Sequence, residues 1–225
     1  MVDLKGKVVL ITGANGALGS AVAERARSLG ANLVLLDLNT PANPQAEDRW
    51  VALDLTDEAA VSAAASEVGP INVLFNVAGG FDMGPAVYEL SQSSFDSLFK
   101  MNVTTFQNVT RAFLPGMVER GSGSVVTIGA LGAAAGQANM GAYGASKSAL
   151  LRLTESLSAE VKHKGVNVNC VLPSIIDTPA NRNDMPNDDH SSWVPPQDLA
   201  NVICFLGSES ARAIHGAAIP VSGLV

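Results

Sequence analysis

Val8-Val-Leu-Ile-Thr-Gly-Ala-Asn-Gly-Ala-Leu-Gly19 is the stretch that decides the fold of this 225-residue chain. The five residues before Gly13 form an apolar run typical of a buried strand, and an alanine-rich helix is predicted from Gly19 to Gly30. Glycines between a strand and a helix let a pyrophosphate approach the backbone, and the helix N-terminus offers free N–H groups. A purely structural turn does not account for three glycines at this spacing. We therefore expect a dinucleotide at Gly13, Asn15, Gly16, Leu18 and Gly19.

The remainder of the chain repeats this alternation of apolar runs and longer amphipathic stretches, which is typical of βαβ units. Strands are predicted at Val8 to Thr12, Asn32 to Asp37, Trp50 to Ala52, Val73 to Val77, Gly123 to Ile128, Val166 to Leu172 and Ala218 to Pro220. Helices are predicted at Gly19 to Gly30, Glu58 to Gly69, Ser91 to Arg120, Tyr143 to Lys164 and Pro196 to Gly207. The expected fold is α/β: one Rossmann domain over residues 1–225, with a doubly wound, parallel, seven-stranded sheet and helices on both faces.

Two connections break the regular alternation. Residues 40–49 are too short and too rich in Pro and Asn for a full helix, so an extended loop is expected. Residues 173–196 carry five prolines and follow the sixth predicted strand. Ligands bind at the carboxyl edge of a doubly wound sheet, so we interpret residues 173–196 as an irregular substrate loop.

Composition restricts the partners. The net charge is -7 and no basic cluster is visible, which argues against nucleic acid and anionic membranes and favours a small-molecule substrate. Cys170 and Cys204 are expected to be buried free thiols, and no histidine has the spacing of a metal site. Residues 1–10 lack the apolar core of a signal peptide and no run of about 18 apolar residues follows, so a cytoplasmic location is expected.

Tyr143-Gly-Ala-Ser-Lys147 carries the chemistry. Residues four apart on a helix share one face, so the Lys147 ammonium can stabilise a tyrosinate at Tyr143 and lower the phenol pKa. A phenol with a lowered pKa is an acid suited to hydride-transfer chemistry.

Two aspartates bear on the cofactor. Asp37 ends the second apolar run, where an acidic side chain can bind the adenosine ribose. Its charge would repel a 2'-phosphate and no Arg or Lys follows in Leu38-Asn-Thr-Pro41, so NAD (NADH) is favoured over NADP. A turn-forming or capping aspartate is the alternative for Asp37. Asp54 can cap the next helix or contact the adenine edge.

Several motifs in this order resemble the short-chain dehydrogenase/reductase family over essentially the whole chain: Thr12 to Gly19, Asp54, Asn76-Val-Ala-Gly79, Asn102 in Lys100-Met-Asn-Val103, Tyr143 to Lys147, and Pro173 with Thr178. The resemblance implies that Tyr143 transfers the proton, that Lys147 also binds the nicotinamide ribose, and that Asn102 holds a water in a proton relay. Asn102 taken by itself is equally explained as a buried asparagine that kinks a helix. Further cofactor contacts are implied at Asp54, Leu55, Asn76, Ala78, Gly79, Pro173, Ile176 and Thr178. A homodimer or homotetramer, paired through the helices that begin near Ser91 and Tyr143, is implied as well.

Three positions depart from the family pattern. The family's catalytic serine falls on Ala130, Ser174 replaces a glycine after Pro173, and Val77 replaces the second asparagine of Asn-Asn-Ala-Gly. The dihydropteridine reductase branch also lacks the serine, and the chain resembles it at Val77-Ala-Gly-Gly80, Gly129-Ala130, Gly141-Ala-Tyr-Gly144, Asp177-Thr-Pro-Ala-Asn-Arg182, Met185-Pro186 and Ser191-Ser-Trp193.

The resemblance predicts an NAD(P)-dependent oxidoreductase that acts on a small organic substrate, with an activated acceptor such as a quinonoid dihydropteridine as one reading. The alternatives are an ordinary carbonyl or secondary-alcohol dehydrogenase or 3-oxoacyl reductase, and a dinucleotide-binding sensor or scaffold with weak catalysis. Candidate substrate contacts are Ala130, Gln137, Arg182 and Trp193, with Asn139 as a further hydrogen-bond donor. For Trp193 a hydrophobic anchor of the loop is the competing explanation.

Overall fold

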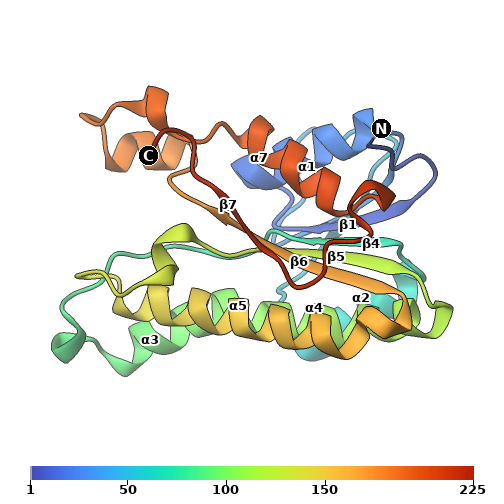
Figure 1. Ribbon diagram of the computed structural model, residues 1–225, viewed down its shortest axis with the longest axis horizontal. Helices are drawn as coiled ribbons and strands as arrows, with labels where there is room; N and C mark the ends of the chain where they lie inside the picture. Colours follow the sequence, from blue (N-terminus) through green and yellow to red (C-terminus); the bar gives the residue numbers. More distant parts are fainter. Residues whose placement is uncertain (1) are drawn as a thin grey trace.

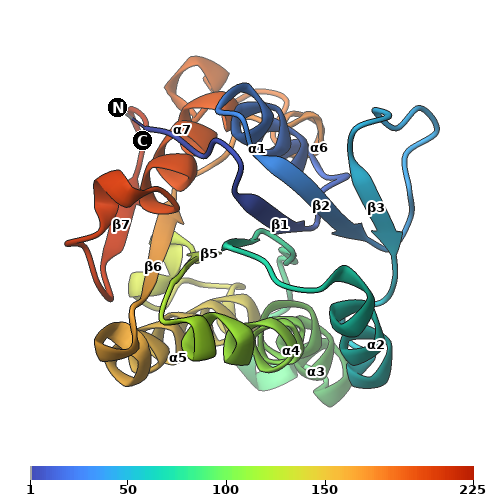
Figure 2. The same cartoon turned by 90° about the vertical axis from the view of Figure 1, so that its right-hand side faces the viewer.

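Seven parallel strands form one sheet in the computed structural model, which describes residues 2–225. Their order across the sheet is β3-β2-β1-β4-β5-β6-β7, so the chain winds outward from β1 to β3 and then returns to build the other half from β4 (Figure 2). The direction of winding reverses between β1 and β4, and ligands bind at such a switch point. The strands are β1 (Val8–Thr12), β2 (Asn32–Asp37), β3 (Arg49–Ala52), β4 (Val73–Asn76), β5 (Gly123–Ile128), β6 (Val166–Pro173) and β7 (Ala218–Val221).

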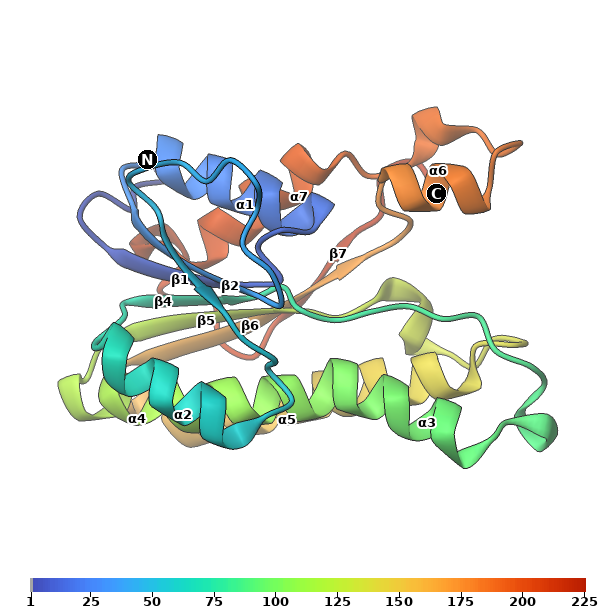
Figure 3. The same ribbon diagram turned by 180° about the vertical axis from the view of Figure 1, so that it is seen from behind.

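Helices cover both faces of this sheet. One face carries α1 (Ala17–Ser28) and α7 (Pro196–Leu206), and the other carries α2 (Glu58–Val68), α4 (Thr105–Arg120) and α5 (Gly141–Val161) (Figure 1). Two shorter helices, α3 (Gln92–Phe99) and α6 (Pro179–Asp184), project beyond the same end of the sheet (Figure 3). The single-domain, doubly wound α/β architecture expected from the sequence is confirmed.

The core consists of two apolar layers separated by the sheet. In β1, Val9 and Ile11 pack into the layer with α1 and α7, while Leu10 packs into the layer with α2 and α4. Successive side chains on a strand point to opposite faces, so a strand buried on both sides needs an unbroken apolar run. The run from Val8 to Ile11 meets that requirement, which is why it identified a central strand.

The helix predicted from Ser91 to Arg120 is interrupted. It consists of α3, a π-helical turn at Lys100–Thr104 and α4, with Asn102 inside the turn. A continuous helix from Ser91 to Arg120 was therefore a wrong prediction. A π turn adds one residue to the helical path and is frequent at functional sites, but its hydrogen-bonding pattern leaves no trace in apolar periodicity.

The two irregular connections differ from each other. Residues 40–49 form turns and bends without a helix, as predicted. Residues 173–196 are more ordered than predicted, because they contain α6 and a 3-10 turn at His190–Ser192. Thr178 caps α6 by accepting a hydrogen bond from the Asn181 N–H, and Pro179 follows at the first helical position. Thr-Pro is a helix-start signal that was overlooked.

Cys170 and Cys204 are both free and buried, as expected. Within residues 2–225, no helix combines the length and the apolar character needed to cross a membrane. The same residues contain no group of three or more His, Cys, Asp or Glu side chains arranged to hold a metal ion.

Candidate functional site

The glycine-rich turn between β1 and α1 is shaped by close backbone contacts. Gly13 has a φ of 65°, and a Cβ added there would lie 2.9 Å from the Ala78 Cα. A Cβ on Gly19 would collide with the Gly13 carbonyl oxygen. No side chain caps the N-terminus of α1 at Gly16, so the N–H groups of its first turn remain available to an anion. The turn therefore fits the pyrophosphate of a dinucleotide.

A hydrogen-bonded trio joins the ends of β1 and β4 beside that turn. The Thr12 hydroxyl donates to Asn76 Oδ1 at 3.3 Å and accepts from the Ala78 N–H at 3.0 Å. Asn76 Nδ2 is buried and has no partner among the described residues. A buried amide without a partner is unusual in a folded protein, and it fits a ligand that brings an acceptor atom to this edge.

Asp37 stands at the end of β2 and faces the same turn. Its Oδ2 accepts a hydrogen bond from the Asn15 N–H at 3.0 Å, and its Oδ1 accepts from the Leu38 N–H at 2.8 Å. The carboxylate is thus held beside the glycine-rich turn, where the adenosine end of a dinucleotide would lie. The same hydrogen bonds show that Asp37 also braces the turn, so the two predicted roles are compatible.

Asp54 does not cap α2. The cap is Asp57, which accepts from the Ala60 N–H at 3.0 Å because the helix begins at Glu58. Asp54 instead accepts from the Thr56 N–H at 2.8 Å, and this hydrogen bond lowers the pKa of its carboxyl group. Its exposed side chain remains free to meet an adenine.

Leu55 is positioned by a residue that the sequence analysis missed. Its side chain is buried in the core, and its carbonyl oxygen accepts a hydrogen bond from Asn108 Nδ2 at 3.0 Å. Asn108 thereby ties α4 to the segment after β3. An asparagine in the apolar face of a predicted helix was the available signal, since a buried amide needs a partner.

A polar cluster surrounds Asn102 beneath the end of β4. Asn102 Oδ1 accepts from the Gly80 N–H at 2.9 Å, and Nδ2 donates to the Gly80 carbonyl at 3.0 Å and to Ser146 Oγ at 3.0 Å. Ser146 in turn donates to the Tyr143 carbonyl at 2.8 Å. The π turn and the first turn of α5 are therefore linked through Ser146, which sequence reasoning overlooked although it lies within the Tyr143–Lys147 motif.

Gly79 separates Asn102 from Lys147. A Cβ added at Gly79 would lie 2.7 Å from Asn102 Oδ1 and 3.1 Å from Lys147 Nζ. Both polar atoms therefore pack against the backbone of Gly79, closer than the side chain of any other residue would allow. Lys147 is buried and donates from Nζ to the Ile128 carbonyl at 2.9 Å.

Burial dominates the titration of Tyr143 and Lys147. Desolvation raises the pKa of Tyr143 to about 12, and desolvation lowers the pKa of Lys147 to about 8. The prediction that Lys147 lowers the phenol pKa is therefore wrong for the protein without a bound ligand. Desolvation by burial is the cause of the raised phenol pKa, and Lys147 Nζ donates its hydrogen bond to the Ile128 carbonyl. The phenol is protonated at neutral pH, which suits a proton donor.

Tyr143 also meets an aromatic partner that was not predicted. The rings of Phe81 and Tyr143 are perpendicular, with centroids 4.9 Å apart and planes inclined by 79°. Phe81 directly follows Gly79 and Gly80, and an aromatic residue after a glycine pair at the end of a strand was the signal for it.

The candidate substrate residues are distributed unevenly. Ala130 lies 8% exposed at the end of β5, where it offers a methyl group. Gln137 is exposed in the loop before α5, with its amide near Gly132. Asn139 is also exposed, and its carbonyl accepts from the Gly84 N–H at 2.9 Å.

Two residues of the substrate loop serve the loop itself. Trp193 is only 4% exposed and packs on His190 with ring centroids 4.4 Å apart, so stacking of Trp193 on a substrate is a wrong prediction and the anchor explanation holds. The Arg182 guanidinium forms an ion pair with Asp177, with Nη2 and Oδ2 2.7 Å apart. Arg182 therefore braces α6 at the surface and has no unpaired charge to offer a substrate.

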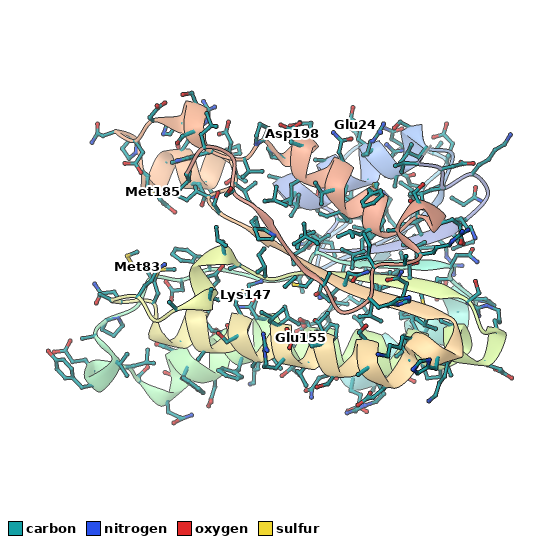
Figure 4. The ribbon with its side chains drawn as sticks, viewed as in Figure 1. Glu24, Met83, Lys147, Glu155, Met185 and Asp198 are labelled. Atoms are coloured by element: carbon teal, nitrogen blue, oxygen red, sulfur yellow. The ribbon has the colours of Figure 1, made fainter. Side chains whose placement is uncertain are left out.

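The ends of the substrate loop are fastened together. Pro173 closes β6, and Ile176 pairs with Val194 in an isolated bridge. Asn181 Nδ2 donates to the Ile176 carbonyl at 2.7 Å, which joins α6 to the same point. The segment that leads from the sheet edge to α6 thus contains Pro173, Ile176 and Thr178. Figure 4 shows Met185 near α6 and Met83 on the segment after β4. Both residues lie beyond the end of the sheet that is nearer to Lys147.

Comparison with known proteins agrees with this geometry. Residues 7–189 match the family described as short chain dehydrogenase. The chain is 30% identical to 2-(S)-hydroxypropyl-CoM dehydrogenase 3 of Xanthobacter autotrophicus, over 98% of this chain and 96% of that one. It is 32% identical to 2,5-dichloro-2,5-cyclohexadiene-1,4-diol dehydrogenase of Sphingobium indicum, over the same shares. The solved aldohexose dehydrogenase of Thermoplasma acidophilum superposes with a TM-score of 0.89 at 27% identity, over 99% of this chain and 95% of that one. The chain belongs to the short-chain dehydrogenase family and is an NAD(P)-dependent oxidoreductase.

Proposed function

We propose that this oxidoreductase uses NADH to reduce an electron-poor, activated acceptor, for which a quinonoid dihydropteridine is the representative. The observation that carries the proposal is the buried methyl group of Ala130, just after β5, at the position where the family resemblance implies a serine. The other residues that the resemblance implies, Tyr143, Lys147 and Asn102, are present. A conjugated acceptor spreads the negative charge that hydride addition creates. Such an acceptor needs a proton donor but no strong hydrogen bond to one oxygen.

The chain's residues have distinct tasks in this proposal. Bound nicotinamide supplies the hydride, and Tyr143 donates the proton to the acceptor atom that has gained the electron pair. In this proposal a water held by Asn102, as the family resemblance implies, returns a proton toward the tyrosine by way of Lys147. Asn102 Oδ1 and Lys147 Nζ both lie close to Gly79, which supports this pairing. Ser146 and Gly80 hold the Asn102 amide in the required orientation through their hydrogen bonds.

Ordinary secondary-alcohol or carbonyl chemistry is the second candidate. It is favoured by the two relatives described above, which are both named as dehydrogenases of alcohols. A hydroxyl donor to a developing oxyanion contributes about 2.7–4 kcal/mol, so an enzyme without one should reduce a simple ketone slowly. Relative rates on activated and simple acceptors therefore separate the two candidates.

The direct test follows NADH absorbance with a quinonoid dihydropterin, a quinone, an aliphatic diketone and an unactivated ketone. The proposal expects turnover of the conjugated acceptors and little turnover of the simple ketone. Faster reduction of the simple ketone would favour the second candidate. Tight NADH binding without turnover of any compound would favour a dinucleotide-binding sensor or scaffold.

A preference for NADH over NADPH follows from Asp37, whose carboxylate is fixed beside the glycine-rich turn. Replacing Asp37 with Ala should lower the ratio of the NADPH dissociation constant to the NADH dissociation constant by at least about fivefold. The reason is that like charges about 4 Å apart repel by about 1 kcal/mol in water. Fluorescence titration of both cofactors measures the ratio. Asp188→Ala, an exposed carboxylate of the substrate loop, serves as the control. Equal or tighter binding of NADPH by the unmodified protein would contradict the preference.

The Gly79→Ala variant tests the proton path without altering a titratable group. The added methyl group would lie 2.7 Å from Asn102 Oδ1 and 3.1 Å from Lys147 Nζ and would push these two groups away, so kcat should fall by up to about 10²-fold. The melting temperature should also fall, and the kcat of the fraction that remains folded is therefore the quantity to measure. Gly136→Ala is the matched control, because a Cβ there meets nothing within 4 Å. Unchanged kcat in Gly79→Ala would show that the positions of Asn102 and Lys147 beside Gly79 do not matter for proton transfer.

We also propose that the protein is a homodimer or homotetramer paired through α4 and α5, as its family resemblance implies. Sedimentation equilibrium measures the mass of the assembly directly. A monomer at micromolar concentration would contradict this part of the proposal.

A further inference from the structure

Phe81 presents an aromatic face beside the proton donor. Its ring is 52% exposed although it contacts Tyr143, and the two ring planes are inclined by 79°. In a perpendicular pair one ring directs its edge at the face of the other. Whichever ring supplies the edge, at least one face of Phe81 remains uncovered by Tyr143. A flat ligand can therefore lie on Phe81 while it stays next to the phenol.

The backbone that carries Phe81 is fixed on its N-terminal side. Both polar backbone atoms of Gly80 bond to the Asn102 side chain, at 2.9 and 3.0 Å. The Met101 sulfur occupies the place that a Cβ on Gly80 would take. Phe81 therefore starts from a residue locked onto the π turn, which sets the direction in which its ring leaves the chain.

The hollow next to Tyr143 has little charge. It is lined by residues 82–85, Val87, Leu90, Asn139, Ala142 and Tyr143, among others, and Asp82 is the only charged side chain among its described lining residues. Phe81 does not line this hollow, but it directly precedes Asp82 and contacts Tyr143. Met83, two residues after Phe81, is 61% exposed. Exposed apolar side chains gathered at a site mark a binding surface, and a carboxylate without a neighbouring cation disfavours an anionic ligand.

We propose that Phe81 is a specificity-determining wall of the acceptor site, and that the acceptor carries a flat, conjugated, uncharged ring that stacks on the free face of Phe81. The inference rests on the proposed function, whose acceptor it describes more narrowly. The electron-rich face of a phenyl ring attracts an electron-poor ring, and stacking fixes the orientation of that ring toward the Tyr143 hydroxyl.

Two variants separate stacking from simple burial of apolar surface. Phe81→Leu keeps an apolar side chain without an aromatic face, and Phe81→Trp keeps the face. The acceptors are 2-methyl-1,4-naphthoquinone, which is flat and conjugated, and 2,3-butanedione, which has no ring. The values of kcat/KM for each acceptor are measured at saturating NADH, with melting temperatures to confirm folding.

Phe81→Leu should lower kcat/KM for the naphthoquinone by about three- to tenfold, while the value for butanedione changes by less than about twofold. Phe81→Trp should restore the value for the naphthoquinone. Tyr88→Leu is the matched control and should change neither, because Tyr88 lies on the same connection but is 87% exposed. Equal losses for both acceptors in Phe81→Leu, or no recovery in Phe81→Trp, would overturn the proposal.

Failure of the proposed function is distinguishable from failure of this inference. If the unmodified protein reduces neither compound, the proposed reduction is wrong, and stacking is then measured by calorimetric titration of 1-naphthol into the NADH-saturated protein. Binding that weakens in Phe81→Leu and recovers in Phe81→Trp supports the aromatic wall. Equal affinity of 1-naphthol for the unmodified protein and for both variants overturns the proposal of an aromatic wall. An unmodified protein that does not bind 1-naphthol overturns it as well.

Discussion

Tyr143→Phe is expected to lower kcat by about 10²–10⁴-fold, the range that a positioned general acid contributes, while NADH binding stays nearly intact. The phenol is protonated at neutral pH, as an unperturbed tyrosine is, and burial raises its pKa further, to about 12. The hydroxyl is therefore available as a donor, and its loss removes the proton source. The remaining phenyl ring can keep the perpendicular contact with Phe81, which preserves the local packing.

The measurement combines steady-state rates with NADH fluorescence titration. The chain's other tyrosine, Tyr88, provides the control: Tyr88→Phe should leave both quantities unchanged because its side chain is 87% exposed. A Tyr143→Phe variant that retains substantial turnover would assign proton donation to another group. Gln137 and Asn139 would then be tested first, since both are exposed in the loop that leads to Tyr143.

Ala130→Ser is expected to raise the reduction of an unactivated ketone relative to a conjugated acceptor, by up to about 10²–10³-fold in the ratio of kcat/KM values. A serine hydroxyl at this position could donate to a carbonyl oxygen as negative charge develops there. A conjugated acceptor gains less, because its charge is already delocalised. The gain depends on a rotamer that points the hydroxyl at the bound carbonyl, and Ala130 is 8% exposed, so the hydroxyl has to fit a nearly filled space.

Ala130→Thr and Ala134→Ser are useful companions to this variant. Threonine brings the same hydroxyl with an extra methyl group, and Ala134 is an exposed alanine of the adjoining 3-10 turn. The ratio of kcat/KM for the unactivated ketone to kcat/KM for the conjugated acceptor should rise only in the variants that add a hydroxyl at position 130. If the unmodified enzyme already reduces simple ketones as fast as conjugated acceptors, or if Ala130→Ser leaves the ratio unchanged, Ala130 does not explain the choice of substrate.

Local chemistry along the chain was enough to predict most of the fold. Apolar runs predicted β1, β2 and β5 with their observed bounds, because a strand buried on both faces requires unbroken apolar residues. The glycines at 13 and 19 predicted a crowded turn, and the structure shows the backbone contacts that exclude a Cβ there. The missing helix at residues 40–49 followed from Pro and Asn in a short connection.

Features that depend on contacts between distant segments could not be predicted in this way. The π turn at Lys100–Thr104 is coupled to Gly80 through Asn102, and this pairing is not encoded in the local pattern. The interpretation of Asp54 as a cap failed for a local reason, although the helix start at Glu58 was predicted correctly: Asp57, which directly precedes that start, takes the capping position.

The sequence by itself determined the parallel α/β sheet, the dinucleotide turn and the pairing of Tyr143 with Lys147 on one helix, because strand burial, glycine geometry and helical periodicity are local properties of the chain. Only the tertiary structure decided the directions of the pKa shifts of that pair, the close approach of Asn102 and Lys147 to Gly79, and the aromatic face of Phe81 beside the phenol. The physical reason is that desolvation and packing depend on which segments meet. Burial raises the pKa of Tyr143 and lowers that of Lys147, so the fold around them reversed the shift that four-residue spacing alone had predicted for the phenol.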